Sequence, residues 1–336
     1  MNFVMQKYTI LIVGGAGYIG SHMVKMLALD GHRVIVLDNL STGFRHSARF
    51  GEKLIVGDLA DKALLDQIFS DNKYDAVMHF AAASLVGESI QNPAKYYRNN
   101  VSNTLNLLEV MVKHHVLNIV FSSTAAIFGE PVYAPINENH PKNPINPYGA
   151  SKLMIERILE DYSVAYGLNS ISLRYFNACG ADPEGDLGEM HEPETHLIPL
   201  VLQAAAGRRE NIKIFGTDYP TADGTCIRDY IHVVDLCDAH KLAINKLLIE
   251  RQKGADVFNL GNGNGFSVRE IINRAIDITT QDQREIEVIE VERRPGDPAV
   301  LVADSVKANE KLGYKPKYSD INMIISHAWE FEKNYR

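Results

Sequence analysis

The stretch "TILIVGGAGYIGSHMV" places three glycines between an apolar run and an amphipathic segment, and this constrains the fold most strongly. Gly14, Gly17 and Gly20 form a G-x-x-G-x-x-G pattern, a spacing variant of the dinucleotide-binding fingerprint. Glycines allow the strand-to-helix turn to form, let the backbone approach a pyrophosphate, and let the helix pack close to the sheet. The free N–H groups at the start of the helix then face the phosphates. The alternative is a tight strand-to-helix turn that binds no ligand.

Short apolar runs and longer amphipathic segments alternate through the first half of the chain. The expected strands are Thr9–Val13, Arg33–Asp38, Lys53–Asp58, Asp75–Ala81, Asn118–Ser123 and Ser170–Asn177. The expected helices are Tyr18–Asp30, Lys62–Ser70, a long helix from Asn92-Pro93 to about His115, and the segment around Tyr148. This order predicts an α/β fold with a Rossmann-like, doubly wound parallel sheet.

The alternation of expected strands and helices becomes less regular after about Asn177, where Gly180–His196 has the composition of a loop. Beyond it we expect helices at Leu197–Ala206 and Ser267–Thr279, and strands at Asn211–Gly216, Asp256–Gly261 and Glu285–Val291. Residues 1–177 should form mainly a dinucleotide-binding domain. Residues 178–336 should form mainly a smaller mixed α/β substrate lobe, with some segments returning to the first domain.

Charge and cysteine content argue against several classes of protein. The net charge is −8 and no basic block occurs, so no nucleic-acid partner is expected. The three cysteines, Cys179, Cys226 and Cys237, form no Cys-x-x-Cys pair and fit free thiols in a reducing cytoplasm. The first apolar run ends in glycines, so we interpret it as a strand and not as a signal peptide. No apolar run approaches the ~20 residues of a membrane span, and no membrane association is expected.

Asp38 ends the strand that follows the glycine loop. A carboxylate at that place binds ribose hydroxyls and repels a 2′-phosphate, which favours NAD over NADP. Arg45 lies nearby and weakens this preference, because a neighbouring arginine can accommodate the 2′-phosphate.

Tyr148 and Lys152 lie one helical turn apart in "NPYGASKLMIE" and so share one helix face. A tyrosine is a poor base at pH 7 unless a nearby ammonium stabilises its phenolate and lowers its pKa. Such a tyrosinate could take a proton from a substrate hydroxyl while hydride leaves the same carbon for the cofactor. The stretch "FSSTAA" adds hydroxyls at the carboxyl end of a strand, where doubly wound sheets bind ligands: Ser122, Ser123 and Thr124.

Together these residues resemble the extended short-chain dehydrogenases/reductases, and within them the UDP-glucose 4-epimerases. The resemblance runs from about Thr9 to Ser305. The segments that carry it include "GGAGYIGSH", "DNLSTG", "FSSTAAIFGE", "NPYGASKLMIE", "LRYFNACGADPEG", "ETHLIPLVLQAAAGRR", "IFGTDYPTADGTCIRDYIHVVDL", "FNLGNGNGFSV" and "RRPGDPAVLVADS".

The resemblance implies an NAD-dependent, reversible 4-epimerisation of UDP-galactose and UDP-glucose through a transient 4-keto sugar, catalysed by a homodimer. It makes Tyr148 the general base and Lys152 a ligand of the nicotinamide ribose that tunes Tyr148. Thr124 would hydrogen-bond the sugar hydroxyl, and Ser123 completes the catalytic set. The implied cofactor contacts are Gly14, Gly17, Tyr18, Ile19, Gly20, Asp38, Asn39, Asp58, Leu59, Phe80, Ala81, Asn99, Ser122, Tyr148, Lys152 and Tyr175. The implied substrate contacts are Thr124, Asn177, His196, Leu197, Phe215, Arg228, Arg294 and Asp297.

Two positions depart from the family pattern. Ser84 stands where some epimerases carry a lysine that contacts the cofactor. Leu301 stands where some carry a tyrosine beside the sugar, so N-acetylated sugars such as UDP-N-acetylglucosamine are an alternative substrate. A 4,6-dehydratase would need an acid pair where this chain has Ala125 and Ala126. A non-catalytic NAD-binding sensor on the same fold is the remaining alternative.

An acidic protein needs local cations to hold UDP, and Arg228 and Arg294 are the candidates. Arg294 could instead be a solvated loop residue, and Phe215 could be a core residue and not a uracil contact. His191 and His196, with Glu192 and Glu194 nearby, raise the question of a metal. Their spacing matches no zinc-protease pattern and no helix is expected to align them, so we expect no metal site. Cys179 has no activating partner in the sequence and is expected to be a packed residue.

Overall fold

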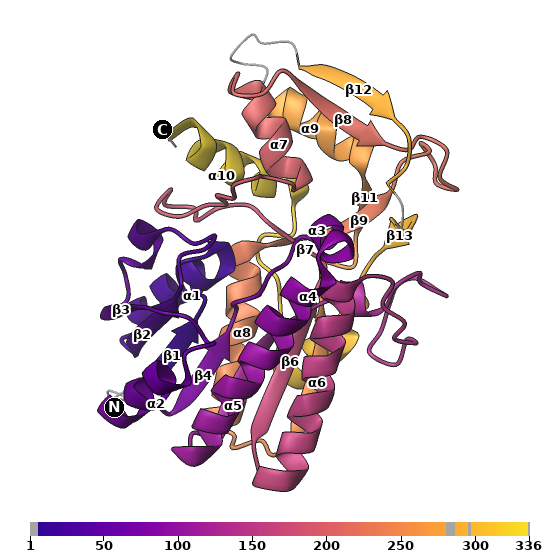
Figure 1. The fold of residues 1–336 in the computed structure, drawn as a ribbon. Coiled ribbons are helices and arrows are strands. Elements are labelled where there is room, and N and C mark those ends of the chain that lie inside the picture. The colour runs from indigo at the N-terminus through magenta and orange to yellow at the C-terminus, as the bar shows by residue number, and fades with distance from the viewer. Residues whose placement is uncertain (1–5, 280–285, 295–296, 335–336) are drawn as a thin grey trace.

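The computed structural model describes residues 6–279, 286–294 and 297–334. Its centre is a seven-stranded, fully parallel sheet with the strand order β10-β6-β5-β4-β1-β2-β3 (Figure 1). The strands are β1 (Thr9–Val13), β2 (Arg33–Asp38), β3 (Lys53–Val56), β4 (Ala76–His79), β5 (Asn118–Thr124), β6 (Asn169–Tyr175) and β10 (Ala255–Leu260). The predicted doubly wound parallel sheet is confirmed.

Helices cover both faces of this sheet because its inner strands are apolar on both sides. Along β1, Ile10 and Ile12 pack into one core and Leu11 and Val13 into the other. The first core includes residues of α1 (Tyr18–Leu29) and α8 (Val233–Leu248). The second includes residues of α2 (Lys62–Asp71), α5 (Asn103–Lys113) and α6 (Pro147–Tyr166). In doubly wound sheets of this kind, ligands bind at the carboxyl ends of the strands.

A smaller assembly lies above one end of the sheet in Figure 1 and has its own core. Its four-stranded sheet mixes parallel and antiparallel pairs, and a parallel two-stranded ladder lies beside helices α7, α9 and α10 (Figure 1). The strands are β7 (Asn177–Cys179), β8 (Asn211–Phe215), β9 (Ile227–His232), β11 (Gly265–Ser267), β12 (Glu287–Val291) and β13 (Val300–Leu301); the helices are α7 (Leu197–Ala205), α9 (Val268–Thr279) and α10 (Ile321–Asn334).

Most predicted elements appear with bounds shifted by one or two residues, and several findings differ from the sequence prediction. The predicted strand Ser170–Asn177 is interrupted, because β6 ends at Tyr175 and Asn177 starts β7 in the other sheet. The predicted long helix is divided into α4 (Pro93–Tyr96), a π-helical stretch Tyr97–Ser102, and α5. A short helix, α3 (Val86–Gln91), precedes it.

The sequence prediction contains neither β9 nor α8, nor the C-terminal helix α10. Glu285, the expected start of a strand, lies outside the described residues, and that strand begins at Glu287. The second half returns to the first through β10, which pairs with β6, and α8, which packs on the main sheet. The division near residue 177 stays a prediction. Within the described ranges, no helix has the length and apolar character required to cross a bilayer.

Candidate active site

The three glycines of the first turn meet different constraints. Gly14 has a left-handed backbone with φ of +82°, and a Cβ there would lie 2.5 Å from the Ala81 amide nitrogen. A Cβ on Gly20 would lie 2.1 Å from the Gly14 carbonyl oxygen, so the chain itself requires both glycines. At Gly17, the residue before α1, a Cβ would meet only the Gly14 oxygen at 3.5 Å. Close approach of a ligand to the helix N-terminus is a physical reason for glycine at that position.

Asp38 lies at the carboxyl end of β2 and is tied to the glycine loop. Its carboxylate oxygens accept hydrogen bonds from the Ala16 amide at 2.9 Å and the Leu40 amide at 2.8 Å. Burial raises the pKa of the Asp38 carboxyl, and these two hydrogen bonds oppose that shift. Next to it, the Asn39 amide donates to Asp58 at 2.6 Å. The predicted adenosine-binding residues therefore meet at one edge of the sheet.

The other predicted cofactor residues lie along the same end of the strands. Phe80 and Ala81 follow β4, and both of their amides donate to the Val13 carbonyl. Leu59 is buried after β3, and its carbonyl accepts from Asn106. Asn99 donates to Asn100 at 3.0 Å, and Asn100 in turn donates to Ser151 on α6.

Tyr148 and Lys152 occupy the first turns of α6. Asn146 caps this helix by accepting a hydrogen bond from the Gly149 amide at 2.9 Å, and Pro147 occupies the first helical position. The Lys152 ammonium is buried and donates to the Ser122 carbonyl at 2.7 Å. Burial lowers the pKa of Lys152 to about 7, and the charge of Glu156 opposes this shift.

The Thr124 side chain at the end of β5 lies close to the Tyr148 hydroxyl. Burial raises the pKa of Tyr148, and the interaction with Thr124 opposes that shift. The expected lowering of the Tyr148 pKa by Lys152 is therefore not observed in this structure, because burial dominates and the ammonium is directed at a backbone carbonyl.

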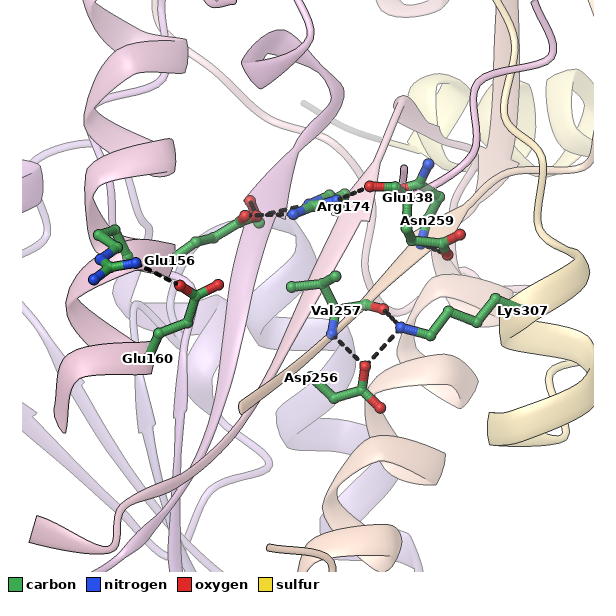
Figure 2. Close-up of polar contacts among 10 residues, drawn as sticks. Glu138, Glu156, Glu160, Arg174, Asp256, Val257, Asn259 and Lys307 are labelled. Atoms are coloured by element: carbon green, nitrogen blue, oxygen red, sulfur yellow. Dashed lines mark hydrogen bonds and ion pairs between the residues drawn. The ribbon is translucent and has the colours of Figure 1, made fainter. Parts of the chain in front are cut away.

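The hydroxyls of Ser122 and Ser123 form hydrogen bonds with different partners. The Ser122 hydroxyl and the Tyr175 hydroxyl share a hydrogen bond, which joins two predicted cofactor residues. The Ser123 hydroxyl donates to Glu156 at 2.6 Å. That carboxylate also binds Arg174 at 2.7 Å in a buried ion pair (Figure 2). Ser123 thus supports this ion pair, and its predicted part in catalysis stays a prediction.

Glu156 and Arg174 were missed by the sequence analysis. Glu156 lies one further turn along the face that carries Tyr148 and Lys152, so the four-residue spacing was the available signal. The pair joins α6 to β6 behind the catalytic face, and Arg174 reaches the Glu138 carbonyl at 3.5 Å (Figure 2). Glu138 accepts the Asn259 amide of β10 at 2.8 Å, which extends the network to the edge of the sheet.

The predicted UDP-binding residues form two pairs. Arg228 on β9 makes an ion pair with Asp297, and its side chain is only 11% exposed. The Arg294 guanidinium lies 3.8 Å from the centroid of the Phe215 ring. Arg294 is an exposed loop residue whose guanidinium stacks on Phe215, and Phe215 is only partly buried at the end of β8.

Three further predicted residues flank these pairs. Asn177 lies on β7 beside β9 and donates to the Asp229 carbonyl at 3.0 Å. Leu197 is the first residue of α7. His196 precedes it, with Nδ1 at 2.7 Å from Glu189, and its substrate contact stays a prediction.

Leu301 connects the two halves of the site. It pairs with Arg228 through β13 and packs against an apolar cluster that includes Ala125 and Ile127, directly after Thr124. A residue at position 301 can therefore affect the space between the UDP pairs and the Tyr148 and Thr124 side chains.

Comparisons with known proteins agree with this geometry. The model of the NAD dependent epimerase/dehydratase family matches residues 10–261. A UDP-glucose 4-epimerase of Halalkalibacterium halodurans is 52% identical over 327 residues, covering 97% of this chain and 96% of that protein.

Two solved structures add information on ligands. The UDP-glucose 4-epimerase of Bifidobacterium longum, in complex with NAD⁺ and UDP, is 38% identical with a TM-score of 0.91, covering 97% of this chain and 98% of that one. The UDP-Glc/GlcNAc 4-epimerase of Campylobacter jejuni is 42% identical with a TM-score of 0.83, covering 98% of this chain and 100% of that one.

Proposed function

This chain belongs to the NAD dependent epimerase/dehydratase family, and we propose that it interconverts UDP-galactose and UDP-glucose by epimerisation at sugar C4. The observation that carries this proposal is the approach of the Thr124 side chain to the Tyr148 hydroxyl at the end of β5, with Lys152 buried one turn further along α6. This constellation combines a proton acceptor with a hydroxyl partner beside the dinucleotide loop.

The residues at the strand ends fit NAD. Gly17 leaves room at the start of α1 for a pyrophosphate, and Asp38 lies where the ribose hydroxyls of the adenosine half would bind. Lys152 would hold the nicotinamide ribose. When bound there, NAD accepts a hydride from sugar C4 and returns it.

Residues of this chain would accept and return the proton of the sugar 4-hydroxyl. With Tyr148 in its phenolate form, which the Lys152 ammonium and the positive nicotinamide of bound NAD would stabilise, the 4-hydroxyl proton passes to the Tyr148 oxygen as the C4–H bond breaks. Thr124 holds the sugar oxygen, and a 4-keto sugar is left. After the sugar turns, the proton returns from Tyr148 to the same oxygen and hydride returns to the other face of C4. No net oxidation occurs, so no second substrate is required.

The UDP part would be bound by the Arg228–Asp297 pair and the Arg294–Phe215 pair. Arg228 and Arg294 supply guanidinium groups for the phosphates of an acidic ligand. Phe215 offers a ring face at the edge of β8 for uracil, and Asn177 offers an amide. Firm binding of UDP leaves the sugar free to turn during the reaction.

The direct test is conversion of UDP-galactose to UDP-glucose by purified protein without added NAD or reductant. We expect bound NAD in the purified protein and formation of UDP-glucose, separated and quantified by ion-exchange chromatography. Folded, NAD-loaded protein that forms no UDP-glucose would refute the proposal and favour a non-catalytic NAD sensor.

We further propose that the site accepts UDP-N-acetylglucosamine. Leucine at position 301 is shorter than tyrosine, and the similar enzyme from Campylobacter jejuni is a UDP-Glc/GlcNAc 4-epimerase. We expect measurable epimerisation of both sugars, and a selective loss of kcat/KM for the acetylated one in Leu301→Tyr. An unchanged ratio in that variant, or outright rejection of the acetylated sugar by the wild type, would contradict this.

We infer a cytoplasmic homodimer. Cys179, Cys226 and Cys237 are buried free thiols, as expected in a reducing compartment. Apolar side chains stay exposed on α3 and the neighbouring α6, among them Val86, Ile90 and Met154, and they offer a patch for a second copy. Light scattering coupled to gel filtration should give twice the 37.5 kDa chain mass, and a monomer would contradict the dimer.

A further inference from the structure

Four side chains converge in the segment that leads into α7. Glu189, His191, Glu194 and His196 each present one donor atom, and all four atoms lie within 4.8 Å of one another. The two glutamate side chains are only 6% and 4% exposed. We call these four residues the His–Glu cluster. From the sequence we expect no metal here, because the spacing matches no zinc-protease pattern and no helix aligns the ligands; in the structure Glu189, and not Glu192, joins the two histidines and Glu194.

The spacing of the donor atoms matches a tetrahedral cation site. Ligands bonded to zinc at 2.0–2.1 Å lie roughly 3.3–3.4 Å from one another. His191 Nδ1 lies 3.2 Å from Glu189 Oε1 and 3.5 Å from Glu194 Oε2, and His196 Nδ1 lies 3.3 Å from Glu194 Oε1. The contact between His196 Nδ1 and Glu189 Oε1 is shorter, at 2.7 Å. His191 Nδ1 is buried and makes no hydrogen bond of acceptable geometry.

A second acidic cluster, earlier in the same segment, is neutralised in a different way. Asp182, Glu184 and Asp186 surround the Lys25 ammonium at 2.7, 2.7 and 2.8 Å, so a side chain of the protein already occupies the cation position. In the His–Glu cluster, the groups that face the carboxylates are two imidazoles, whose neutral form binds metals. One divalent cation with two neutral imidazoles balances the two carboxylates as well as two imidazolium ions would.

We propose that Glu189, His191, Glu194 and His196 form a structural zinc site. Two nitrogen and two oxygen ligands suit Zn²⁺, and four protein ligands leave no open coordination position for catalysis. The bound zinc would help to hold the two halves of the molecule together. The His191 ring lies 6.4 Å from the ring of Tyr18 at the start of α1, and His196 precedes the first turn of α7.

The test is the zinc content of protein purified without chelator and passed through metal-free buffer, measured by mass spectrometry. We expect about one zinc per chain in the wild type and in Glu192→Gln, a matched control in the same loop whose side chain is exposed and outside the cluster. In His191→Asn and Glu194→Gln, zinc affinity should fall by ~100-fold or more. Zinc retained equally by these variants, or no zinc binding by the wild type, would overturn the proposal.

A second measurement needs no variant. Wild-type protein in which Co²⁺ replaces zinc should show the intense visible absorption of a tetrahedral N/O site. The weak absorption of an octahedral ion would overturn the proposal. Both readouts are independent of turnover, so their failure is distinguishable from a failure of the proposed epimerase activity.

Discussion

The cofactor side and the substrate side of this site are built in different ways. On the cofactor side, Gly14, Asp38 and Ala81 lie just beyond or at the carboxyl ends of the neighbouring strands β1, β2 and β4 of one sheet, where backbone geometry places them. On the substrate side, Arg228 and Phe215 come from separate short strands and are positioned through side chains, by Asp297 and Arg294. The comparison indicates that the positions of the cofactor-side residues depend on the fold itself. Specificity depends on side-chain pairs that can change without altering the fold.

The strongest test of this contrast is Tyr148→Phe. The phenylalanine keeps the ring and removes the hydroxyl that lies close to Thr124, so kcat should fall by about 10²–10⁴-fold. Binding of UDP, measured by calorimetry, should not change because the UDP pairs are untouched. Tyr162→Phe, on the same helix, serves as the control and should keep full activity. Near-normal turnover in Tyr148→Phe would show that another group takes the proton.

The glycine loop allows a matched pair of substitutions. Gly20→Ala forces a Cβ to within 2.1 Å of a backbone oxygen, so it should destabilise the protein by about 1–3 kcal/mol or more. Gly17→Ala meets no such clash and should keep its stability while losing NAD affinity. Thermal unfolding and bound NAD, measured together, check both. Equal stability of the two variants would contradict the separation of packing from ligand binding.

Arg228→Lys tests the substrate side. Lysine keeps the charge but loses the planar fork that matches a phosphate, so KM for UDP-galactose should rise roughly 10–100-fold. Bound NAD and the melting temperature should stay close to those of the wild type. The Arg274→Lys variant is a control, because Arg274 pairs with Glu270 on α9 and not with a predicted UDP residue. A lost cofactor in Arg228→Lys would show that the two sides are not separable.

The smallest expected effect concerns the stability of the fold at acidic pH, through a histidine that lies near the predicted cofactor-binding residues. His240 is buried, with its ring 4.8 Å from Phe80 and 6.2 Å from Tyr175, and burial lowers its pKa to about 4. Because the folded pKa lies below the unfolded value of 6.5, this group contributes stability that is present above pH 6.5. That stability is lost as the pH falls toward 4, by at most about 1.4 kcal/mol per pH unit.

His240→Leu should therefore flatten the dependence of unfolding free energy on pH between 6.5 and 4. Urea unfolding at several pH values measures it. The substitution of exposed His46 by leucine should leave the wild-type slope unchanged. An equally steep slope in His240→Leu would contradict the assignment.

The sequence predicts the cofactor side better than the substrate side, for a physical reason. The glycine spacing, Asp38 and the Tyr148–Lys152 pair are local patterns, and strand ends bring them together without further information. Arg228 was identified by resemblance, but its strand β9 and the following α8 were missed. The sequence analysis placed Glu192, and not Glu189, beside His191 and His196, because loop geometry is set by tertiary contacts that local patterns do not encode. Likewise, spacing alone does not reveal that Ser123 bonds Glu156 and not a ligand.

The most direct test of the account follows the hydrogen at sugar C4. UDP-galactose carrying deuterium at C4 is incubated with the purified protein, and the UDP-glucose formed is examined by mass spectrometry and NMR. If C4–H leaves as hydride and returns to the same carbon while Tyr148 handles only the hydroxyl proton, deuterium is retained at C4 of the product. Loss of the label to water would contradict the account, because C4–H would then have left as a proton.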